Sequence, residues 1–524
     1  MTTTTEHRAG TATNNAATPA ASTVLRIRGR IHLCTDTTLG SSTSDHSADT
    51  RIARDTETGR PLWAGTGQAG ALRHHLAAVL GDTHAATIFG TGDTDSAVRT
   101  TDALAYRTDG GYPTTSLRTG NRIDTATGIV DPGAVFTDEV LPAGTVFLVD
   151  WSLHAPSAQL TDLTAALVRA VDGFDDDSIR LGARAGKGRG ETRASHWQID
   201  LHELGTATGF EAWYTRERTP RWPTPDEKID SGDDLAARLG IVLPGVADRV
   251  AALRAIDRRT RIVVTASLAV AETVLVGTDA HAPSETTRPA TMVQGTGGDD
   301  DGDRGPLARS PLTRPTGRVG AESPIDSGSA VHSMLKRHGR WILHALANRV
   351  DSPDAAAHAD AITDDLFGSS TRGNRTPRRL RSSRVTVTES PIHAATAAQL
   401  PHVRLNPLTQ GAVDGHLFFE DVLVGGTSTL TITIARASLP DLGLLDWILR
   451  DLTHGAGPAM GAATTNGHGR RVLIAAEFDI PADLYDGHPD GWHAESLSSY
   501  FGSGTALREA AHRALDTAIA EGLS

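Results

Sequence analysis

The chain of 524 residues carries two copies of one long segment, and this internal repeat constrains its fold more than any other feature. The segment that begins at Gly120 aligns without gaps on the one that begins at His402, at an offset of 282 residues (404 − 122 = 282). The matching pairs are Arg122 and Arg404, Gly133 and Gly415, Phe136 and Phe418, Val140-Leu141 and Val422-Leu423, and Gly144-Thr145 and Gly426-Thr427. A repeat of this length indicates two homologous units.

Three shorter segments repeat in the same order. LGARAGKGRG (residues 181–190) pairs with MGAATTNGHG (residues 460–469), with glycine at three shared positions. IFG at Ile88 pairs with LFG at Leu366. A proline, a small-residue turn and a basic residue also recur at equal spacings: Pro61, Gly65 and Arg73 in the first copy, and Pro324, Gly328 and Lys336 in the second. Each unit is therefore expected to contain a turn that opens a basic helix, then a hairpin, then a glycine-rich loop.

The repeats divide the chain as follows. Residues 1–23 have the composition of a disordered tail, and the first unit spans residues 24–215. A linker follows over 216–258, with one helix from Asp233 to about Ile256. The second unit spans residues 259–524 and carries a low-complexity insert at about 284–322, which is expected to be a mobile loop.

Each unit opens on a pattern typical of a β-strand. In VLRIRGRIHL, apolar residues alternate with Arg26, Arg28 and Arg30, and RIVVTASLAV begins the second unit. A strand, a helix and a later hairpin predict an α+β fold in which two ferredoxin-like units with insertions follow one another. The arginine row would suit a sheet that binds a nucleic-acid backbone, or it is simply a solvated strand face.

The first copy of the turn reads Gly65-Thr-Gly67-Gln-Ala-Gly70, which has the spacing of a dinucleotide-binding loop. The buried apolar strand that such a loop needs is missing before Gly65, and the second copy, DSGSAVHSMLK, lacks the glycine pattern. A nucleotide-binding metabolic enzyme is therefore disfavoured. The turn can still present backbone N–H groups to a phosphate, because it opens a helix.

Composition sets weaker limits. The net charge of −13 argues mildly against a nucleic-acid partner, although net charge hides how charges are distributed. The basic residues are nearly all arginine, which suits bidentate phosphate contacts and is also what a GC-rich genome supplies. The single cysteine, Cys34, lies in an apolar run and is expected in the core. With no membrane-spanning run and no signal-peptide core, a cytoplasmic protein is expected.

Taken together, the repeated motifs resemble the RAMP superfamily, and more narrowly the backbone subunits of type III CRISPR effector complexes. RPLWAGTGQAGALR is similar to the family's proline and glycine element, although Ala64 replaces its second proline. The hairpin segment from Gly120 to Phe147 is close to the element that the family uses as a thumb, and both glycine-rich segments resemble its C-terminal loop. The usual subunit has one such unit, so this chain resembles a fusion of two.

The resemblance implies RRM-like folds that hold a CRISPR guide RNA beside other type III subunits, with no membrane partner. The RNA-binding residues that it implies are Arg26, Arg28, Gly65, Gly67, Arg73, Arg122, Lys187, Arg189, Gly328, Lys336, Arg404 and Gly467. It also implies cleavage of complementary target RNA by an aspartate between the first strand and the proline turn. Asp49, twelve residues before Pro61 (61 − 49 = 12), holds that position, although a loop acid without a function is the alternative.

The chemistry needs little from the protein, because RNA supplies its own 2′-hydroxyl nucleophile. A carboxylate at Asp49 can accept the proton or hold Mg²⁺ or another divalent cation, which keeps most of its waters. His46 could assist proton transfer, while Asp45 and Asp55 are the acids most easily mistaken for the catalytic one.

The sequence of the second unit has no aspartate at the position that matches Asp49. Twelve residues before Pro324 stands Leu312, so the candidate acid there is Asp303 in the DDDGD run of the insert, which could also be a solubilising acidic stretch. Two other functions remain open for the whole chain. One is a guide-RNA scaffold that does not cut, and the other is a metal-independent endoribonuclease that processes precursor CRISPR RNA.

Overall fold

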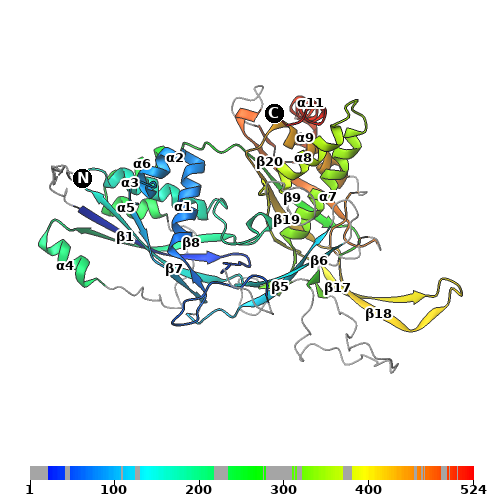
Figure 1. The fold of residues 1–524 in the computed structure, drawn as a ribbon, viewed down its shortest axis with the longest axis horizontal. Coiled ribbons are helices and arrows are strands. Elements are labelled where there is room, and N and C mark those ends of the chain that lie inside the picture. The colour runs from blue at the N-terminus through cyan, green and yellow to red at the C-terminus, as the bar shows by residue number, and fades with distance from the viewer. Residues whose placement is uncertain are drawn as a thin grey trace, which may run out of the picture.

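A computed structural model describes most of the chain as two lobes, each built from a sheet with helices packed on it (Figure 1). The described residues are 22–41, 48–107, 110–123, 130–216, 234–274, 277–278, 310–311, 313–315, 322–369, 381–453, 457–461, 464, 467–484, 492–494, 496–503 and 505–523. None of the helices described there is long and apolar enough to cross a membrane.

The first lobe contains a six-stranded sheet centred on β1 (Ser22–Leu33), which pairs antiparallel with two long strands. Its apolar residues Leu25, Ile27 and Ile31 are fully buried, as the alternating sequence pattern predicts. The sheet order is β2-β4-β7-β1-β8, and β3 also pairs with β7. The bounds are β2 (Leu62–Trp63), β3 (Val98–Thr100), β4 (Ala103–Arg107), β7 (Thr145–Pro156) and β8 (Thr192–Glu203).

The second lobe repeats this arrangement around β9 (Arg261–Val270), with the order β15-β19-β9-β20-β21. Its other strands are β15 (Val385–Val387), β19 (Thr427–Ala435), β20 (Arg471–Ile480) and β21 (Trp492–Ala494). All pairings in both sheets are antiparallel. In each lobe the first strand lies between the strand that follows the hairpin and the strand that follows the glycine-rich loop. The predicted mixture of helices and antiparallel sheets is confirmed.

Each lobe sends out a hairpin, and the two hairpins share one register. The first joins β5 (Ser116–Ile123) to β6 (Val130–Val140), and the second joins β17 (Thr396–Leu405) to β18 (Ala412–Val424). Gly120 pairs with Phe136, and the residues 282 positions later, His402 and Phe418, pair in the same way. The sequence repeat therefore extends to the pairing of individual residues. The second hairpin projects from the molecule at the lower right of Figure 1.

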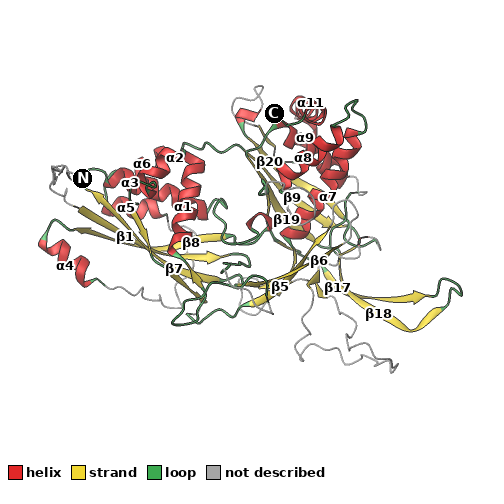
Figure 2. Cartoon of the chain, viewed as in Figure 1, coloured by secondary structure: helices red, strands yellow, loops and turns green. Residues whose placement is uncertain are grey.

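Helices cover one face of each sheet (Figure 2). The first lobe uses α1 (Gly65–Leu80), α2 (Asp82–Phe89) and α3 (Leu160–Val171). The second uses α7 (Gly328–Ala347), α8 (Ala355–Phe367), α9 (Leu439–Thr453) and α11 (Thr505–Glu521). Each lobe has its own apolar core. The C-terminal amphipathic helix packs against its own unit, as predicted, through buried Leu507 and Leu515.

Two expectations are corrected, and one helix was not predicted. The single helix expected from Asp233 to Ile256 is two helices, α5 (Leu235–Val242) and α6 (Val246–Arg254). Pro244 and Gly245, whose φ is +84°, interrupt the helix, and both helices pack into the core of the first lobe. An additional helix, α4 (Ala207–Thr215), follows β8. Cys34 is half-buried at the end of β1 rather than in the core.

The predicted insert is described only in part. Within it, β12 (Ser310–Pro311) pairs with β11 (Gly277–Thr278), and β13 (Thr313–Pro315) pairs with β14 (Glu322–Asp326). The central residues of the insert and residues 1–21 of the expected N-terminal tail lie outside the described residues, whereas Ser22 and Thr23 begin β1. Two more short strands, β10 (Thr273–Val274) and β16 (Ser390–Pro391), pair with β18 and β14.

Candidate nucleic-acid interface

The loop that carries Asp49 lies along strand β6 of the first hairpin. The Asp49 N–H donates to the carbonyl oxygen of Thr137 (2.8 Å), and the Thr137 N–H donates back to Asp49 Oδ2 (2.8 Å). One residue further, the Glu139 N–H donates to the carbonyl oxygen of Thr50 (2.9 Å). These bonds fix the position of an exposed carboxylate against the base of the hairpin.

The buried carboxylate of Glu139 holds the next part of the loop. It accepts hydrogen bonds from the Ile52 N–H (3.0 Å), Arg54 Nη2 (2.5 Å) and the Thr115 hydroxyl (2.7 Å), and Arg51 Nε lies 3.5 Å away. Burial would raise the pKa of Glu139, but the hydrogen bonds from Thr115, Ile52 and Arg54 outweigh it and lower the pKa. The loop is thus bound to the hairpin by a carboxylate that stays ionised.

Asp138, beside Glu139, is the point at which three sequence motifs meet. Its buried carboxylate accepts from Arg184 Nε (2.5 Å) and Arg189 Nη1 (2.9 Å), both of which belong to the glycine-rich loop. Thr50, next to Asp49, forms a β-bridge with Asp138. The Arg184 guanidinium also lies over the ring of Phe136, 3.8 Å from its centroid. The loop that carries Asp49, the hairpin and the glycine-rich loop therefore form one site.

The glycine-rich loops adopt a conformation that requires glycine. All three glycines shared by the two copies have positive φ: Gly182, Gly188 and Gly190 in the first lobe, and Gly461, Gly467 and Gly469 in the second. A Cβ on Gly190 would lie 2.0 Å from the carbonyl oxygen of Leu181, and one on Gly469 would lie 1.9 Å from that of Met460. The two loops thus share a backbone path that the sequence repeat marked.

In the first lobe this loop also contacts the second lobe. A Cβ on Gly328, the first residue of α7, would lie 2.4 Å from the carbonyl oxygen of Lys187. Nearby, Arg118 of β5 donates to Glu389 Oε1 of the second lobe (2.7 Å) and to Asp36 Oδ2 (3.1 Å). Both Arg118 and Glu389 are buried. Gly328 is therefore a packing residue between lobes in this structure.

Two cationic side chains at the junction have lowered pKa values. Burial, together with the nearby charges of Arg184, Lys336 and Arg189, lowers the pKa of Lys187 to about 8. Burial also lowers the pKa of Arg189 to about 10, with a contribution from Arg118. Burial is the main cause of both shifts and neighbouring positive charges add to it, so a phosphate placed here would favour the charged forms again.

The turn at Gly65 is already capped. The Gly65 N–H donates to Asp102 Oδ1 (2.7 Å), and the Thr100 hydroxyl donates to the carbonyl oxygen of Gly65 (2.7 Å). A Cβ on Gly65 would lie 2.8 Å from the carbonyl oxygen of Thr100, and one on Gly67 would meet the Trp63 ring at 3.3 Å. These glycines permit close packing in the lobe, and the expected phosphate site at this turn is occupied by a carboxylate of the chain.

The shared basic residues of the first helices have a structural partner in both lobes. Arg73 Nη1 donates to the carbonyl oxygen of Gly90 (2.7 Å), and Lys336 Nζ donates to that of Gly368 (2.6 Å). These two glycines end the repeated IFG and LFG segments. The repeat therefore preserves a bond between the first helix and the end of the second one.

The expected open arginine face of β1 is corrected for Arg26. Its side chain is only 4% exposed and forms a two-pronged ion pair with Asp150, in which Nε donates to Oδ1 (2.9 Å). Arg28 Nη2 donates to Asp200 Oδ2 (2.8 Å) in a more open position. Acids on the neighbouring strands thus pair with two of the three arginines in this row.

The remaining expected residues divide into two groups. Arg404 and Gly467 are exposed in the second lobe, the first on strand β17 and the second in the glycine-rich loop. Asp303, Asp45, His46 and the side chain of Arg122 lie outside the described residues. The acid pair Asp138-Glu139 was missed, although the second copy carries Glu420-Asp421 at the matching positions and the repeat could have pointed to it.

The described residues suit a divalent cation that keeps most of its water ligands. They contain no group of three or more His, Cys, Asp and Glu side chains that could hold a metal ion. Asp49 offers an exposed carboxylate, one oxygen of which accepts the Thr137 N–H. This donor set suits a largely hydrated ion that also contacts phosphate, and it does not suit an all-protein cage.

Comparison with known proteins supports the resemblance over the first lobe. Residues 21–193 match the family model of the RAMP superfamily. A matching solved structure, described as "Cryo-EM structure of the Type III-B Cmr-beta bound to cognate target RNA", is 18% identical over 34% of this chain and 60% of the other, with a TM-score of 0.27. No curated protein matches the chain. The resemblance to the RAMP superfamily is confirmed for residues 21–193.

Proposed function

We propose that this chain, whose residues 21–193 match the RAMP superfamily, is a guide-RNA-binding backbone subunit of a type III CRISPR effector complex, made of two tandem ferredoxin-like units. We further propose that it cleaves complementary target RNA at Asp49. The observation that carries this proposal is the convergence of three motifs at Asp138, with an exposed, fixed carboxylate beside them.

The site can perform the chemistry with few groups. Arg184 and Lys187 supply positive charge beside the hairpin, where an RNA backbone would bind. Asp49 would accept the proton of the 2′-hydroxyl or hold a hydrated divalent cation next to the scissile phosphate. A bound cation would neutralise charge on that phosphate. Since the loop is bonded to the hairpin at Asp49, at Thr50 and at Ile52, the Asp49 carboxylate needs no rearrangement to act.

The test is target cleavage by the chain purified with its co-expressed partners and bound RNA. Asp49→Asn keeps an oxygen that can accept the Thr137 N–H but removes the charge, so we expect it to lose cleavage about as fully as Asp49→Ala, by roughly a hundredfold or more. Asp55→Asn is the matched control, because Asp55 lies in the same loop and its carboxylate binds Thr58 rather than the hairpin. It should cleave normally.

The outcomes separate the alternatives. If Asp49→Asn copurifies with guide RNA and target cleavage is complete, the chain is a scaffold subunit that does not cut RNA. Cleavage of precursor guide RNA that persists in EDTA would indicate a processing enzyme instead. Asp303→Ala tests the second unit, whose candidate acid lies outside the described residues.

A further inference from the structure

One arginine and two tyrosines form a cluster in the first lobe, at the end of the loop that carries Asp49. The guanidinium carbon of Arg60 lies 4.2 Å from the centroid of the Tyr112 ring and 5.6 Å from that of the Tyr106 ring. Arg60 Nη1 also donates to the Tyr106 hydroxyl (3.3 Å), and the two ring centroids are 6.2 Å apart. We call these three residues the tyrosine cluster. None of them is among the RNA-binding residues that the sequence resemblance implies.

Tyr112 presents an aromatic ring to solvent. The residue is 56% exposed, and Arg60 covers one side of its ring through a cation–π contact. The next residue, Pro113, is buried and restricts the backbone that carries the ring. A flat ligand could therefore stack on the exposed part of a ring whose position is already fixed, which reduces the entropy lost on binding.

Arg60 brings positive charge next to this ring. In the described part of the chain its guanidinium donates to the Tyr106 hydroxyl and forms no ion pair. An acid is nevertheless close, because hydrogen bonds from Thr58 lower the pKa of Asp55 and the charge of Arg60 contributes to that lowering. A phosphate beside Tyr112 would meet a guanidinium that still has donors to offer.

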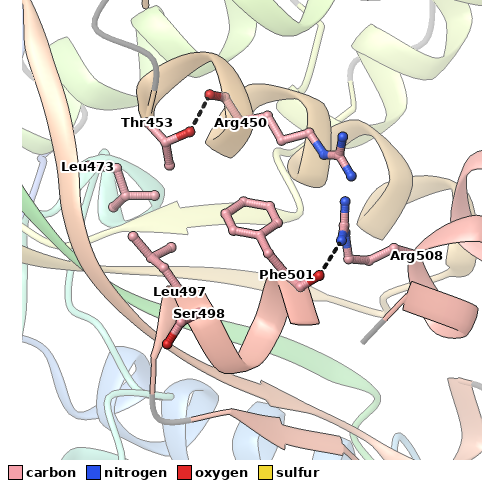
Figure 3. A pocket seen from close by; sticks show the side chains of 7 residues that line it. All are labelled: Arg450, Thr453, Leu473, Leu497, Ser498, Phe501 and Arg508. Atoms are coloured by element: carbon pink, nitrogen blue, oxygen red, sulfur yellow. Dashed lines mark hydrogen bonds between the residues drawn. The ribbon is translucent and has the colours of Figure 1, made fainter. Parts of the chain in front are cut away.

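A pocket between α9, α11 and the short helix α10 (Leu497–Ser503) shows the contrasting case of an arginine that serves packing (Figure 3). Arg508 lies 4.9 Å from the centroid of the Phe501 ring. Its Nε donates to Asp446 Oδ1 (2.9 Å) and its Nη1 donates to the carbonyl oxygen of Phe501 (3.2 Å). Arg508 is buried, whereas Arg60 is half-buried and donates to a single hydroxyl.

The tyrosine cluster is continuous with the candidate interface through Glu139. Thr115, three residues after Tyr112, donates its hydroxyl proton to Glu139 Oε1 (2.7 Å). Glu139 lies two residues from Thr137 on β6, and Thr137 is bonded to Asp49. Two residues of a strand span about 7 Å. The cluster and the Asp49 carboxylate therefore lie along the same part of the hairpin, where one RNA strand can reach both.

We propose that Tyr112 stacks on an unpaired base of the bound RNA and that Arg60 contacts an adjoining phosphate. Aromatic rings stack on bases of any sequence, and an arginine beside the ring adds charge that the RNA backbone complements. The inference rests on the proposed function, because it places RNA along the Asp49 loop. It adds Tyr112 as a positioning residue, which holds the strand near the carboxylate without touching the reacting atoms.

The affinity of the full chain for RNA tests the stack, and fluorescence anisotropy with a labelled single-stranded oligouridylate measures it. We expect Tyr112→Ala to weaken binding at least about fivefold and Tyr112→Phe to bind like the wild type, because the ring carries the interaction. Tyr214→Ala is the matched control, since Tyr214 on α4 is 67% exposed and lies outside the cluster. Normal binding by Tyr112→Ala, or equal losses in Tyr112→Ala and Tyr112→Phe, would overturn the stack.

The salt dependence of binding tests the phosphate contact. We expect Arg60→Gln to weaken RNA binding and to reduce the slope of log affinity against log salt concentration by about 0.7, the value for one phosphate of a single strand. Tyr112→Ala should leave this slope unchanged, because tyrosine carries no charge. An unchanged slope in Arg60→Gln would refute the contact.

The strand that supplies the base is identified with 2-aminopurine, whose fluorescence is quenched when it stacks. It is placed at successive positions of the target and of a synthetic guide RNA in the reconstituted complex. We expect one position to be quenched in the wild type and to brighten in Tyr112→Ala, and the strand that carries this position is the ligand. If no position responds, or if Tyr112→Ala loses a protein subunit while it binds RNA normally, the proposal is wrong.

A failure here can be told from a failure of the proposed cleavage. Asp49→Asn should keep the affinity for RNA and the 2-aminopurine signal, whereas Tyr112→Ala should raise the KM of target cleavage more than it lowers kcat. Normal cleavage by Asp49→Asn together with weak RNA binding by Tyr112→Ala would reject catalysis and retain the stack. Loss of cleavage in Asp49→Asn together with normal binding by Tyr112→Ala would reject the stack alone.

Discussion

At the scale of single residues, Lys187 shows how the junction between the lobes is charged. Its pKa is lowered to about 8, chiefly by burial and then by the nearby Arg184, Lys336 and Arg189. A lysine in water titrates near 10.5, so the fold favours the neutral amine. Protons are therefore bound by the unfolded chain between about pH 8 and 10.5, and stability rises with pH across that range. A phosphate at this place would reverse the preference.

This reversal predicts pH-dependent RNA binding. At pH 7 the amine is mostly charged, and at pH 9 it is mostly neutral, because its pKa is about 8. If a phosphate contacts the charged form, affinity for single-stranded RNA should fall about tenfold from pH 7 to pH 9. Fluorescence anisotropy at constant ionic strength measures the effect. Lys187→Arg is the control, since arginine stays charged and should remove the pH dependence; an unchanged profile in this variant would assign it to other groups.

Asp138 allows a prediction about stability at the same scale. Its buried carboxylate balances Arg184 and Arg189, and these bonds together with the two charges hold its pKa down although burial would raise it. Asp138→Ala leaves the buried Arg189 without this partner, so we expect a loss of about 3–5 kcal/mol in the free energy of unfolding. Urea denaturation measures it. Asp55→Ala, in the exposed turn, should leave the midpoint unchanged, and equal effects would argue against Asp138 as the organising residue.

The Asp138 contribution also has a defined pH range. Because the folded pKa lies below the ordinary value of 3.8, the stabilisation is present above that value and is lost as pH falls through the folded pKa. The difference in unfolding free energy between wild type and Asp138→Asn should therefore narrow below about pH 4.

At the scale of elements, the sequence could predict the elements that occur in both copies of the repeat and the strands in which apolar and polar residues alternate. The sequence predicted the strand β1, the hairpin and the glycine-rich loop. Alternating apolar and polar residues indicate a half-buried strand, and glycines at matching positions of the two copies indicate a backbone with positive φ. The break between α5 and α6 could also have been predicted, because Pro244 and Gly245 interrupt a helix. The helical pattern continues on both sides of these two residues, so a single helix was predicted instead.

Two glycines, one crowded and with positive φ and the other in a helix with open space around it, test the role assigned to the repeated glycines. Gly190 has a φ of +75°, and a Cβ there would lie 2.0 Å from the Leu181 carbonyl oxygen, so Gly190→Ala should destabilise the first lobe by at least about 2 kcal/mol. Gly70 lies within α1, where a Cβ would meet nothing within 4 Å. Gly70→Ala should stabilise the chain by about 1 kcal/mol because alanine favours a helix. Urea denaturation of both variants would contradict the reading if the two shifts had the same sign.

At the scale of the whole molecule, the sequence could not predict how the lobes meet. Arg118 and Glu389 are 271 residues apart, and no spacing or pattern in the sequence marks them as partners. The same holds for Arg26 and Asp150, whose pairing buries one arginine of the face that was expected to be open. Ion pairs formed by folding depend on the register of distant strands, and periodicity within one strand carries no information about them.

The buried pair between the lobes leads to a last prediction. Arg118 and Glu389 have side chains that are 8% and 1% exposed, and the pKa of Arg118 is raised by Glu389 and Asp36 although burial opposes this. Removal of Arg118 would leave Glu389 as a buried carboxylate without this partner, whereas removal of Glu389 would leave Arg118 with Asp36. A double-mutant cycle with Arg118→Met and Glu389→Gln should therefore give a coupling energy of at least about 1.5 kcal/mol in urea unfolding. The exposed pair Arg249 and Asp162 is the matched control and should give a coupling near zero. A coupling energy near zero for Arg118 and Glu389 would mean that this pair does not link the stabilities of the two lobes.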